Sequence, residues 1–262
     1  MLPPNLKIKN NSLPDSPGVY FFYNPAGLLL YVGKATSLKK RISSYFAKAL
    51  DQRLTEMVAQ ITKIEYIETP TVIEALVLEA NQIKTQKPKY NILERDDKSF
   101  LYLTITNEKF PRPVLQRGWD LERLGINPFE QHLSPKTKKI FLAVFGPYTS
   151  GAALKKSLDL IRKIIPWSDC RPLEITGRHK PCFNVYLGRC PGVCVGQISR
   201  QDYRKIIKNL ILFFEGKKGF LIKKLKKEMT QASKNLHFET AAKLRNQIFA
   251  LEHIQDVAVI SC

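Results

Sequence analysis

Two tyrosines, a lysine and an arginine lie close together near the start of this 262-residue chain, in "GVYFFYNPAGLLLYVGKATSLKKRISSYF" (residues 18–46). Around a phosphodiester, a phenol can take a proton from water, and a cation can stabilise the charge that develops on the phosphate. A plain hairpin followed by a solvated basic helix would have the same composition. The segment therefore has two interpretations, a nuclease site and an ordinary structural hairpin.

The two aromatic runs, "VYFFY" and "LLLYV", predict an antiparallel hairpin, because they are rich in strand formers and "NPAG" between them is typical of a turn. With a four-residue loop at 24–27, Tyr20 lies directly opposite Tyr31, and Gly18 lies opposite Gly33. Directly opposed residues share a face, with Cβ atoms roughly 5 Å apart. We therefore expect the two phenols side by side.

A basic helix is predicted directly after the hairpin, capped by Thr36 or Ser37. Its apolar stripe consists of Leu38, Ile42 and Phe46. Arg41 and Tyr45 are four residues apart, so they meet on the neighbouring face. Residues 34–48 hold five basic residues and no acidic one: Lys34, Lys39, Lys40, Arg41 and Lys48. This surface suits a DNA backbone, and we expect Lys39 and Lys40 to contact it.

A second helix is predicted over "TVIEALVLEANQIKT" (residues 71–85), with an inward stripe of Val72 or Ile73, Leu76, Ala80 and Ile83. Glu79 borders this stripe, and Glu74 points about 140° away from Glu79. We expect Glu79 to face the interior or a cleft and Glu74 to face solvent. A carboxylate against apolar groups needs a cation. An ion pair with Arg41 or Lys34 and a bound metal ion are both open.

The charge of the chain favours a polyanionic partner. It has 42 Lys and Arg against 23 Asp and Glu, a net charge of +19. Such an excess promotes binding to nucleic acid first and to an anionic membrane surface second. We expect no membrane insertion and no export, because the sequence lacks a run of about 18 apolar residues and a hydrophobic N-terminal region. A cytoplasmic location follows, where cysteines are reduced.

Four of the five cysteines fall within 25 residues, with the spacing C-x11-C-x7-C-x3-C: Cys170, Cys182, Cys190 and Cys194. This clustering predicts metal or cluster binding, by zinc or by an iron–sulfur cluster. The pairs of CxxC typical of zinc ribbons are absent, which disfavours zinc. Basic residues between the cysteines are predicted to contact DNA phosphate: Arg171, Arg178, Lys180 and Arg189. Cys262 is assigned no role.

An antiparallel helical hairpin is predicted at the C-terminal end. "LHFETAAKLRNQIFALEHI" (residues 236–254) has an apolar stripe of Ala241, Leu244, Ile248, Leu251 and Ile254. A matching stripe precedes it, formed by Leu221, Ile222, Leu225 and Met229, with a break near Asn235. From the pattern alone, this hairpin is either a cap on the core or a docking module.

These elements define an α+β chain with four segments. Residues 14–93 contain the hairpin and both helices, and residues 94–144 are predicted as a strand and loop connection with an irregular polar insertion around 119–139. Residues 145–198 begin with "FGPYTS", continue into a helix from about Gly151 to Ile165 and carry the cysteines. Residues 199–262 are helical, with the hairpin at about 217–254.

The motifs resemble those of a known family. Gly18-Val19-Tyr20 and Tyr31-Val32-Gly33 are similar to the halves of the GIY-YIG nuclease signature, and "YVGKATSLKKRISSYF" resembles the N-terminal domain of the UvrC family. The similarity continues through "EALVLEANQIKTQKPKYNILERDDKSF", "FGPYTS", the cysteine segment and "NLHFETAAKLRNQI". This collinear series is far more specific than the GIY-YIG pattern alone.

The resemblance implies roles for single residues. The catalytic positions of the family fall on Tyr20, Tyr31, Lys34, Arg41, Tyr45 and Asn91. Its metal-binding glutamate falls on Glu79, which implies one Mg²⁺ or Mn²⁺ ion. Tyr20 or Tyr31 would activate water, provided that Lys34 and Arg41 favour the phenolate over a phenol of pKa near 10. The sequence does not choose between the two tyrosines.

The resemblance also implies a 4Fe–4S cluster on the four cysteines and a UVR hairpin that docks on UvrB. The docking residues would include Phe238, Leu244 and Ile248. The implied function is incision 3′ of a lesion in damaged duplex DNA held by UvrB, within the UvrA–UvrB–UvrC system. The family's RNase H-like and helix-hairpin-helix regions are not matched in these 262 residues. The alternative is a non-catalytic adaptor, or a truncated regulator, that binds DNA and UvrB.

Overall fold

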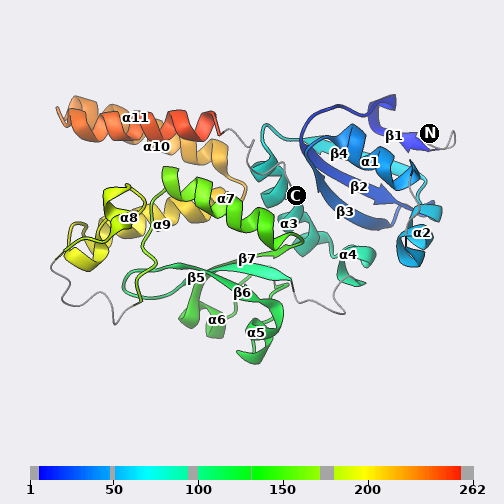
Figure 1. The fold of residues 1–262 in the computed structure, drawn as a ribbon, viewed down its shortest axis with the longest axis horizontal. Helices are drawn as coiled ribbons and strands as arrows, with labels where there is room; N and C mark the ends of the chain where they lie inside the picture. The colour runs from blue at the N-terminus through cyan, green and yellow to red at the C-terminus, as the bar shows by residue number, and fades with distance from the viewer. Residues whose placement is uncertain (1–5, 48–50, 94–99, 131, 172–179, 255–262) are drawn as a thin grey trace.

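The computed structural model describes residues 6–47, 51–93, 100–130, 132–171 and 180–254. Two β-sheets lie on either side of helix α3 (Val72–Gln86), and a helical hairpin lies along α7 (Gly151–Ile164) (Figure 1). This mixed architecture confirms the predicted α+β class. None of the helices in the described ranges combines the length and the apolar character needed to cross a bilayer.

The first sheet contains the predicted hairpin. Its strand order is β1-β4-β2-β3, with bounds β1 Lys7–Ile8, β4 Lys63–Glu68, β2 Gly18–Tyr23 and β3 Leu29–Ala35. One face packs against α1 (Leu38–Ala47), which Ser37 caps by accepting a hydrogen bond from the Lys40 backbone N–H. The other face packs against α3 through Val19, Val32 and Ala75. Short helices α2 (Gln52–Ala59) and α4 (Lys89–Leu93) complete this unit.

The predicted register of the hairpin is wrong by two residues. Tyr20 pairs with Gly33, Phe22 pairs with Tyr31, and an irregularity follows Phe22. The loop is longer than predicted, because Asn24 accepts hydrogen bonds from the backbone N–H groups of Gly27 and Leu28. Since side chains alternate with a period of two, a two-residue shift leaves Tyr20 and Tyr31 on the same face.

The second sheet is antiparallel, with order β6-β5-β7 and bounds β5 Leu101–Thr106, β6 Pro113–Arg117 and β7 Phe141–Tyr148. Strand β7 continues through residues 144 and 145, where the sequence suggested a change of segment. The 119–139 region is more ordered than predicted. It contains α5 (Gly118–Arg123) and α6 (Pro135–Ile140), and its apolar residues Leu121, Ile126 and Phe129 are buried. These residues are widely spaced, so the sequence shows no periodicity.

From Arg200 onward the described chain is helical, as predicted for residues 199–262. Its helices are α9 (Arg200–Phe214), α10 (Lys218–Lys234) and α11 (Phe238–Glu252), and the short helix α8 (Phe183–Tyr186) precedes them. Asn235 ends α10 and Leu236 adopts a positive φ, so the break lies where the sequence placed it. Leu221, Leu225 and Leu251 are fully buried in the main core, together with Ile161 of α7. The hairpin is therefore packed onto the body of the protein.

Lys84 of α3 binds the second sheet through an unusual buried ammonium group. Its Nζ donates a hydrogen bond of 2.9 Å to the carbonyl oxygen of Val144 in β7. Burial lowers the pKa of Lys84 to about 8, and the charge of Glu130 opposes only part of this shift. Part of the stability of the interface between α3 and β7 therefore depends on pH.

Replacing Lys84 with Met should change that pH dependence. Because the folded-state pKa lies below the ordinary lysine value, the unfolded chain binds more protons between the two values, and the stability of the wild type rises with pH there. Between pH 7 and pH 10, the wild type should become more stable relative to Lys84→Met by about 2 kcal/mol. Urea unfolding at both pH values measures this, and a pH-independent difference would contradict it.

Candidate active site

Three tyrosines from three elements form one buried cluster. Tyr20 of β2, Tyr31 of β3 and Tyr45 of α1 have ring centroids 6.0–6.3 Å apart. The hydroxyl groups of Tyr20 and Tyr45 share a hydrogen bond of 2.8 Å. All three side chains are at least nine-tenths buried, over Phe22. The predicted neighbourhood of Tyr20 and Tyr31 is confirmed, and Tyr45 joins it.

Gly33 makes this cluster possible. It lies directly opposite Tyr20 in the hairpin, and the tyrosine ring folds over it. A Cβ at this position would overlap the hydroxyl and ring of Tyr20 and would lie 2.9 Å from the ring of Tyr31. The glycine of the second motif half therefore provides the space in which both phenols lie.

Arg41 lies beside the cluster, four residues before Tyr45. Its guanidinium carbon is 5.1 Å from the centre of the Tyr45 ring, and its Nη2 donates to the Tyr45 hydroxyl at 3.4 Å. Burial by itself would lower the pKa of Arg41, but the phenols of Tyr20 and Tyr45 raise it overall. The arginine is thus held as a cation against the tyrosines.

The same environment keeps Tyr20 protonated. Burial, together with Tyr45, raises the pKa of Tyr20 well above its ordinary value, and Arg41 offsets only part of this shift. We expected neighbouring cations to favour the phenolate, and at Tyr20 burial outweighs Arg41. The prediction that Tyr20 could act as the base therefore loses support in this conformation.

Glu79 of α3 is buried at the edge of β3. Its Oε1 accepts a hydrogen bond of 2.9 Å from the backbone N–H of Lys34, and its Oε2 lies 3.4 Å from the Lys34 ammonium. The hydroxyl of Thr149 donates to Oε2 at 3.1 Å. The inward orientation of Glu79 is confirmed, and its cation here is Lys34. Thr149, from "FGPYTS", was not among the predicted site residues.

The two groups of side chains flank the same edge strand. Gly33 contacts Tyr20 on the α1 side, and the next residue, Lys34, binds Glu79 on the α3 side. Consecutive residues of a strand point to opposite faces. The candidate site is therefore the β3 edge, with the phenols and Arg41 on one side of the strand and the carboxylate on the other.

Glu74 and Asn91 each bind a partner within the fold. Glu74 accepts from the Lys218 ammonium at 2.9 Å instead of facing solvent alone, because α10 begins beside α3. Asn91 is fully buried, and its amide both donates to and accepts from the backbone of Val32 at 2.9 and 2.8 Å. These two bonds tie α4 to the free edge of β3, and the catalytic role of Asn91 stays a prediction.

The four clustered cysteines are free thiols that influence one another. Burial raises the pKa of Cys194, and a hydrogen bond with Cys170 and the nearby Cys182 and Cys190 raise it further. Among the residues that the structure describes, no three His, Cys, Asp or Glu side chains are arranged as a metal-binding group. The four thiols therefore lie close enough together for three of them to raise the pKa of the fourth.

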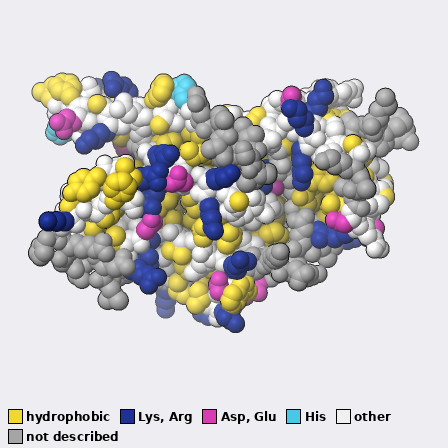
Figure 2. Space-filling view, in the orientation of Figure 1, with side chains coloured by type: hydrophobic (Ala, Val, Ile, Leu, Met, Phe, Trp, Pro, Cys, Tyr) yellow, Lys and Arg dark blue, Asp and Glu magenta, His cyan; other side chains and the backbone are white. Residues whose placement is uncertain are grey.

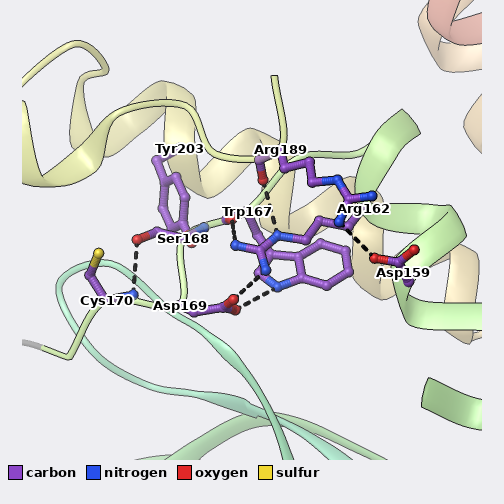
Figure 3. A network of polar contacts seen from close by, with 8 residues as sticks. All are labelled: Asp159, Arg162, Trp167, Ser168, Asp169, Cys170, Arg189 and Tyr203. Carbon is purple, nitrogen blue, oxygen red and sulfur yellow. Dashed lines mark hydrogen bonds and ion pairs between the residues drawn. The ribbon is translucent and has the colours of Figure 1, made fainter. Parts of the chain in front are cut away.

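A polar network anchors both ends of the cysteine segment (Figure 3). Arg162 of α7 donates to the carbonyl oxygens of Trp167 and Arg189 at 2.9 and 3.1 Å and pairs with Asp169. On the other side, the Ser168 N–H donates to the Tyr203 hydroxyl at 3.1 Å, and the Ser168 hydroxyl accepts from the Cys170 N–H at 3.2 Å. Helices α7 and α9 thus fix the backbone next to Cys170 and Cys190.

The predicted DNA-binding residues fall into three settings. Lys39, Lys40 and Lys180 are exposed, as is Arg171, and basic side chains outnumber acidic ones on the face seen in Figure 2. Arg189 is different, since it pairs with Asp159 at 2.9 Å. Arg178 lies outside the described residues. Lys39, Lys40 and Lys180 are exposed cations of the kind that contacts a DNA backbone.

The predicted docking residues of the tail differ in solvent exposure. Phe238 is 63% exposed, near Leu236, which is 73% exposed. Leu244 is partly buried against the main core, and Ile248 is 5% exposed within it. The assignment of Ile248 to a docking surface is corrected, because α11 turns this side chain toward the body of the protein.

The hairpin, the tyrosine cluster and the buried glutamate together form a domain of the GIY-YIG class. Models of three families match the chain: the UvrC-like GIY-YIG domain at residues 16–92, the UvrC/Cho excinuclease middle domain at 100–213, and the UvrB/uvrC motif at 221–254. Over the region that it spans, the chain belongs to the UvrC family.

Individual relatives agree with this assignment. The chain is 40% identical over 251 residues to the UvrABC system protein C of Moorella thermoacetica and 44% identical over 250 residues to that of Carboxydothermus hydrogenoformans. Each match covers 95% of this chain and 38% of the relative. A crystal structure of the GIY-YIG N-terminal endonuclease domain of UvrC from Thermotoga maritima, bound to magnesium, is 38% identical, with a TM-score of 0.28. The match covers 30% of this chain and 86% of the Thermotoga maritima domain.

Proposed function

We propose that the chain is a metal-dependent DNA endonuclease subunit of nucleotide excision repair, which incises the damaged strand 3′ of a lesion in DNA held by UvrB. The observation that carries this proposal is the buried carboxylate of Glu79, which α3 holds against one side of strand β3. The phenols lie on the other side of the same strand. The family membership and the net charge of +19 support DNA as the substrate. Such a role implies a cytoplasmic location.

Glu79 fits a divalent cation by its donor chemistry. Mg²⁺ and Mn²⁺ prefer hard oxygen ligands, and Mg²⁺ is often held by one or two carboxylates while it keeps several waters. Oε1 of Glu79 accepts one hydrogen bond and keeps a free lone pair, while Oε2 accepts one from Thr149 and lies 3.4 Å from the Lys34 ammonium, which a bound cation would replace. Bound there, the ion would act as a Lewis acid on the scissile phosphate.

The remaining side chains of the site have separate roles around the phosphate. Arg41, held as a cation beside Tyr45, stabilises the negative charge that develops on the phosphate oxygens. We assign the activation of water to Tyr20 or Tyr31, and the raised pKa of Tyr20 disfavours Tyr20 as the base in this conformation. Lys34 neutralises Glu79 before DNA binds and supplies a second positive charge at this edge.

A nicking assay tests the proposal. Lesion-bearing duplex DNA is incubated with UvrA, UvrB, Mg²⁺ and either the wild-type chain or Glu79→Ala. The wild type should nick the damaged strand, and Glu79→Ala should leave it intact. Equal nicking by the two proteins would remove Glu79 from the mechanism.

A non-catalytic adaptor that binds DNA and UvrB is the second candidate. It is favoured by two features of this conformation, the pairing of Glu79 with Lys34 and the raised pKa of Tyr20. An adaptor would bind lesion-bearing DNA with UvrB and leave both strands intact in the same assay. The metal-dependent nick therefore separates the two candidates.

We further propose a 4Fe–4S cluster on the four cysteines. Four thiolates are the usual ligand set of such a cluster, and the anchored backbone beside Cys170 and Cys190 would hold two of them in place. Protein purified without oxygen should be brown, absorb near 400 nm and contain iron and sulfide in equal amounts. Stoichiometric zinc without sulfide would instead identify a zinc site.

The exposed Phe238 is proposed to dock on UvrB through the UVR motif. Replacing it with Asp should weaken UvrB-dependent incision about tenfold, because a charge would enter an apolar contact. Folding should be unaffected, since the side chain is exposed. Leu124→Asp, an exposed apolar residue outside the tail, is the control. Equal rates for Phe238→Asp and the wild type would make the hairpin a structural cap only.

A further inference from the structure

Thr149 connects the second sheet to the candidate nuclease site. It follows the last residue of β7 and precedes Ser150, which caps α7 by accepting a hydrogen bond of 3.2 Å from the Ala153 N–H. The Thr149 hydroxyl donates to Oε2 of Glu79 at 3.1 Å and accepts from the Lys34 ammonium at 3.2 Å. Its partners lie 70 and 115 residues away in the sequence.

We propose that Thr149 is a positioning residue of the nuclease site, so that the middle domain completes a site whose other residues belong to the GIY-YIG domain. The inference rests on the proposed role of Glu79 as the metal ligand. A hydroxyl has one donor and two acceptor lone pairs, so it can satisfy a carboxylate and an ammonium together. Thr149 uses both capacities at once.

The geometry explains why two domains are needed. The backbone N–H of Lys34 in β3 fixes Oε1 of Glu79, and Thr149 fixes Oε2. Hydrogen bonds at both oxygens fix the orientation of the carboxylate plane. The free lone pairs of the carboxylate therefore point in fixed directions. With the hydroxyl removed, the carboxylate would keep one anchor and the Lys34 ammonium, which competes with a bound cation.

The position of Thr149 is itself well fixed. Strand β7 packs against α3, with Ala143, Phe145 and Tyr148 in the same core as Leu76 and Ala80. On the other side, the Ser150 cap ties the segment to the first turn of α7. The hydroxyl is therefore placed by a strand end and a helix start, both of which are rigid supports.

The supporting hydrogen bonds of a metal-ligating group typically affect metal affinity 10–100-fold. We therefore expect Thr149→Val, which keeps the shape and removes the hydroxyl, to weaken Mn²⁺ binding to the full chain about tenfold. Thr149→Ser should restore the affinity to within about twofold of the wild type. The metal concentration that gives half-maximal nicking should rise in the same proportion for Thr149→Val.

The experiment is a Mn²⁺ titration of the full chain without DNA, followed by electron paramagnetic resonance. Glu79→Ala defines binding elsewhere on the protein. Thr85→Val is the matched control, because the Thr85 hydroxyl donates only to the Asn81 carbonyl of its own helix, at 2.8 Å. Should Thr149→Val lower the thermal unfolding midpoint, Thr149→Ala serves as the second variant, since it adds no apolar bulk.

The outcomes separate the inference from the proposed function. Wild-type Mn²⁺ affinity in folded Thr149→Val or Thr149→Ala would overturn the inference and leave the nuclease proposal intact. Weakened binding rescued by serine would support it even if the chain proved to be a non-nicking adaptor. Unchanged Mn²⁺ affinity in Glu79→Ala would overturn the metal role of Glu79 and the inference with it.

Discussion

Glu79→Gln should reduce UvrB-dependent incision by about 10³-fold or more, which corresponds to about 4 kcal/mol of transition-state stabilisation. The substitution keeps the size of the side chain and its capacity to accept a hydrogen bond from Lys34, so the α3–β3 contact should persist. It removes the negative charge that a divalent cation requires. DNA binding should change little, because one carboxylate is lost from a chain with a net charge of +19.

Glu74→Gln is the matched control on the same helix. Glu74 pairs with Lys218 and accepts from the Thr71 hydroxyl at the start of α3, away from the β3 edge. Its loss should leave the incision rate within about threefold of the wild type and lower stability slightly, since partly exposed pairs contribute about 1 kcal/mol or less. Single-turnover nicking rates measure both variants. Equal losses would contradict the separate roles of the two carboxylates.

Gly33→Ala should remove most of the incision activity because it displaces the phenols rather than a metal ligand. The new methyl group would overlap the hydroxyl and ring of Tyr20 and crowd Tyr31, so both rings must move or the hairpin must shift. Overpacking of this kind costs about 1–3 kcal/mol of stability. A displacement of the phenols by about 1 Å is enough to reduce incision by about 100-fold. Urea unfolding and the nicking rate measure the two effects.

Gly219→Ala is the control for this change. It lies in the first turn of α10, with nothing within 4 Å of the position of a new methyl group. Alanine is a better helix former than glycine by up to about 1 kcal/mol, so this variant should be as stable as the wild type or more stable. If Gly33→Ala behaves in the same way, the tyrosine cluster does not depend on close packing at Gly33.

Local patterns were sufficient to predict several elements from the sequence. Helix α3 begins one residue after the predicted start because Thr71 caps it, and its inward stripe and Glu79 are buried as the 3.6-residue period requires. The break at Asn235 and the helix after "FGPYTS" follow from equally local signals. Tyr20 and Tyr31 share a face because face assignment depends only on alternation along the strands.

The features that were missed depend on contacts distant in sequence. The hairpin register was wrong because the loop conformation, set by hydrogen bonds to Asn24, adds an irregularity that residue types do not reveal. The contact of Thr149 with Glu79 requires the two sheets to pack on opposite sides of α3. Ile248 was assigned to a docking surface because an apolar stripe does not reveal which neighbour covers it. The raised pKa of Tyr20 likewise results from burial in the assembled fold.

We propose that the Glu79 edge of this chain cuts damaged DNA. The cut can be mapped on a duplex with one lesion, each strand end-labelled in turn, after UvrA and UvrB have loaded on it. We expect a single nick on the damaged strand 3′ of the lesion, which appears with Mg²⁺ and is absent with EDTA or Glu79→Gln. Intact strands in the presence of Mg²⁺, with the chain bound to the UvrB–DNA complex, would contradict it.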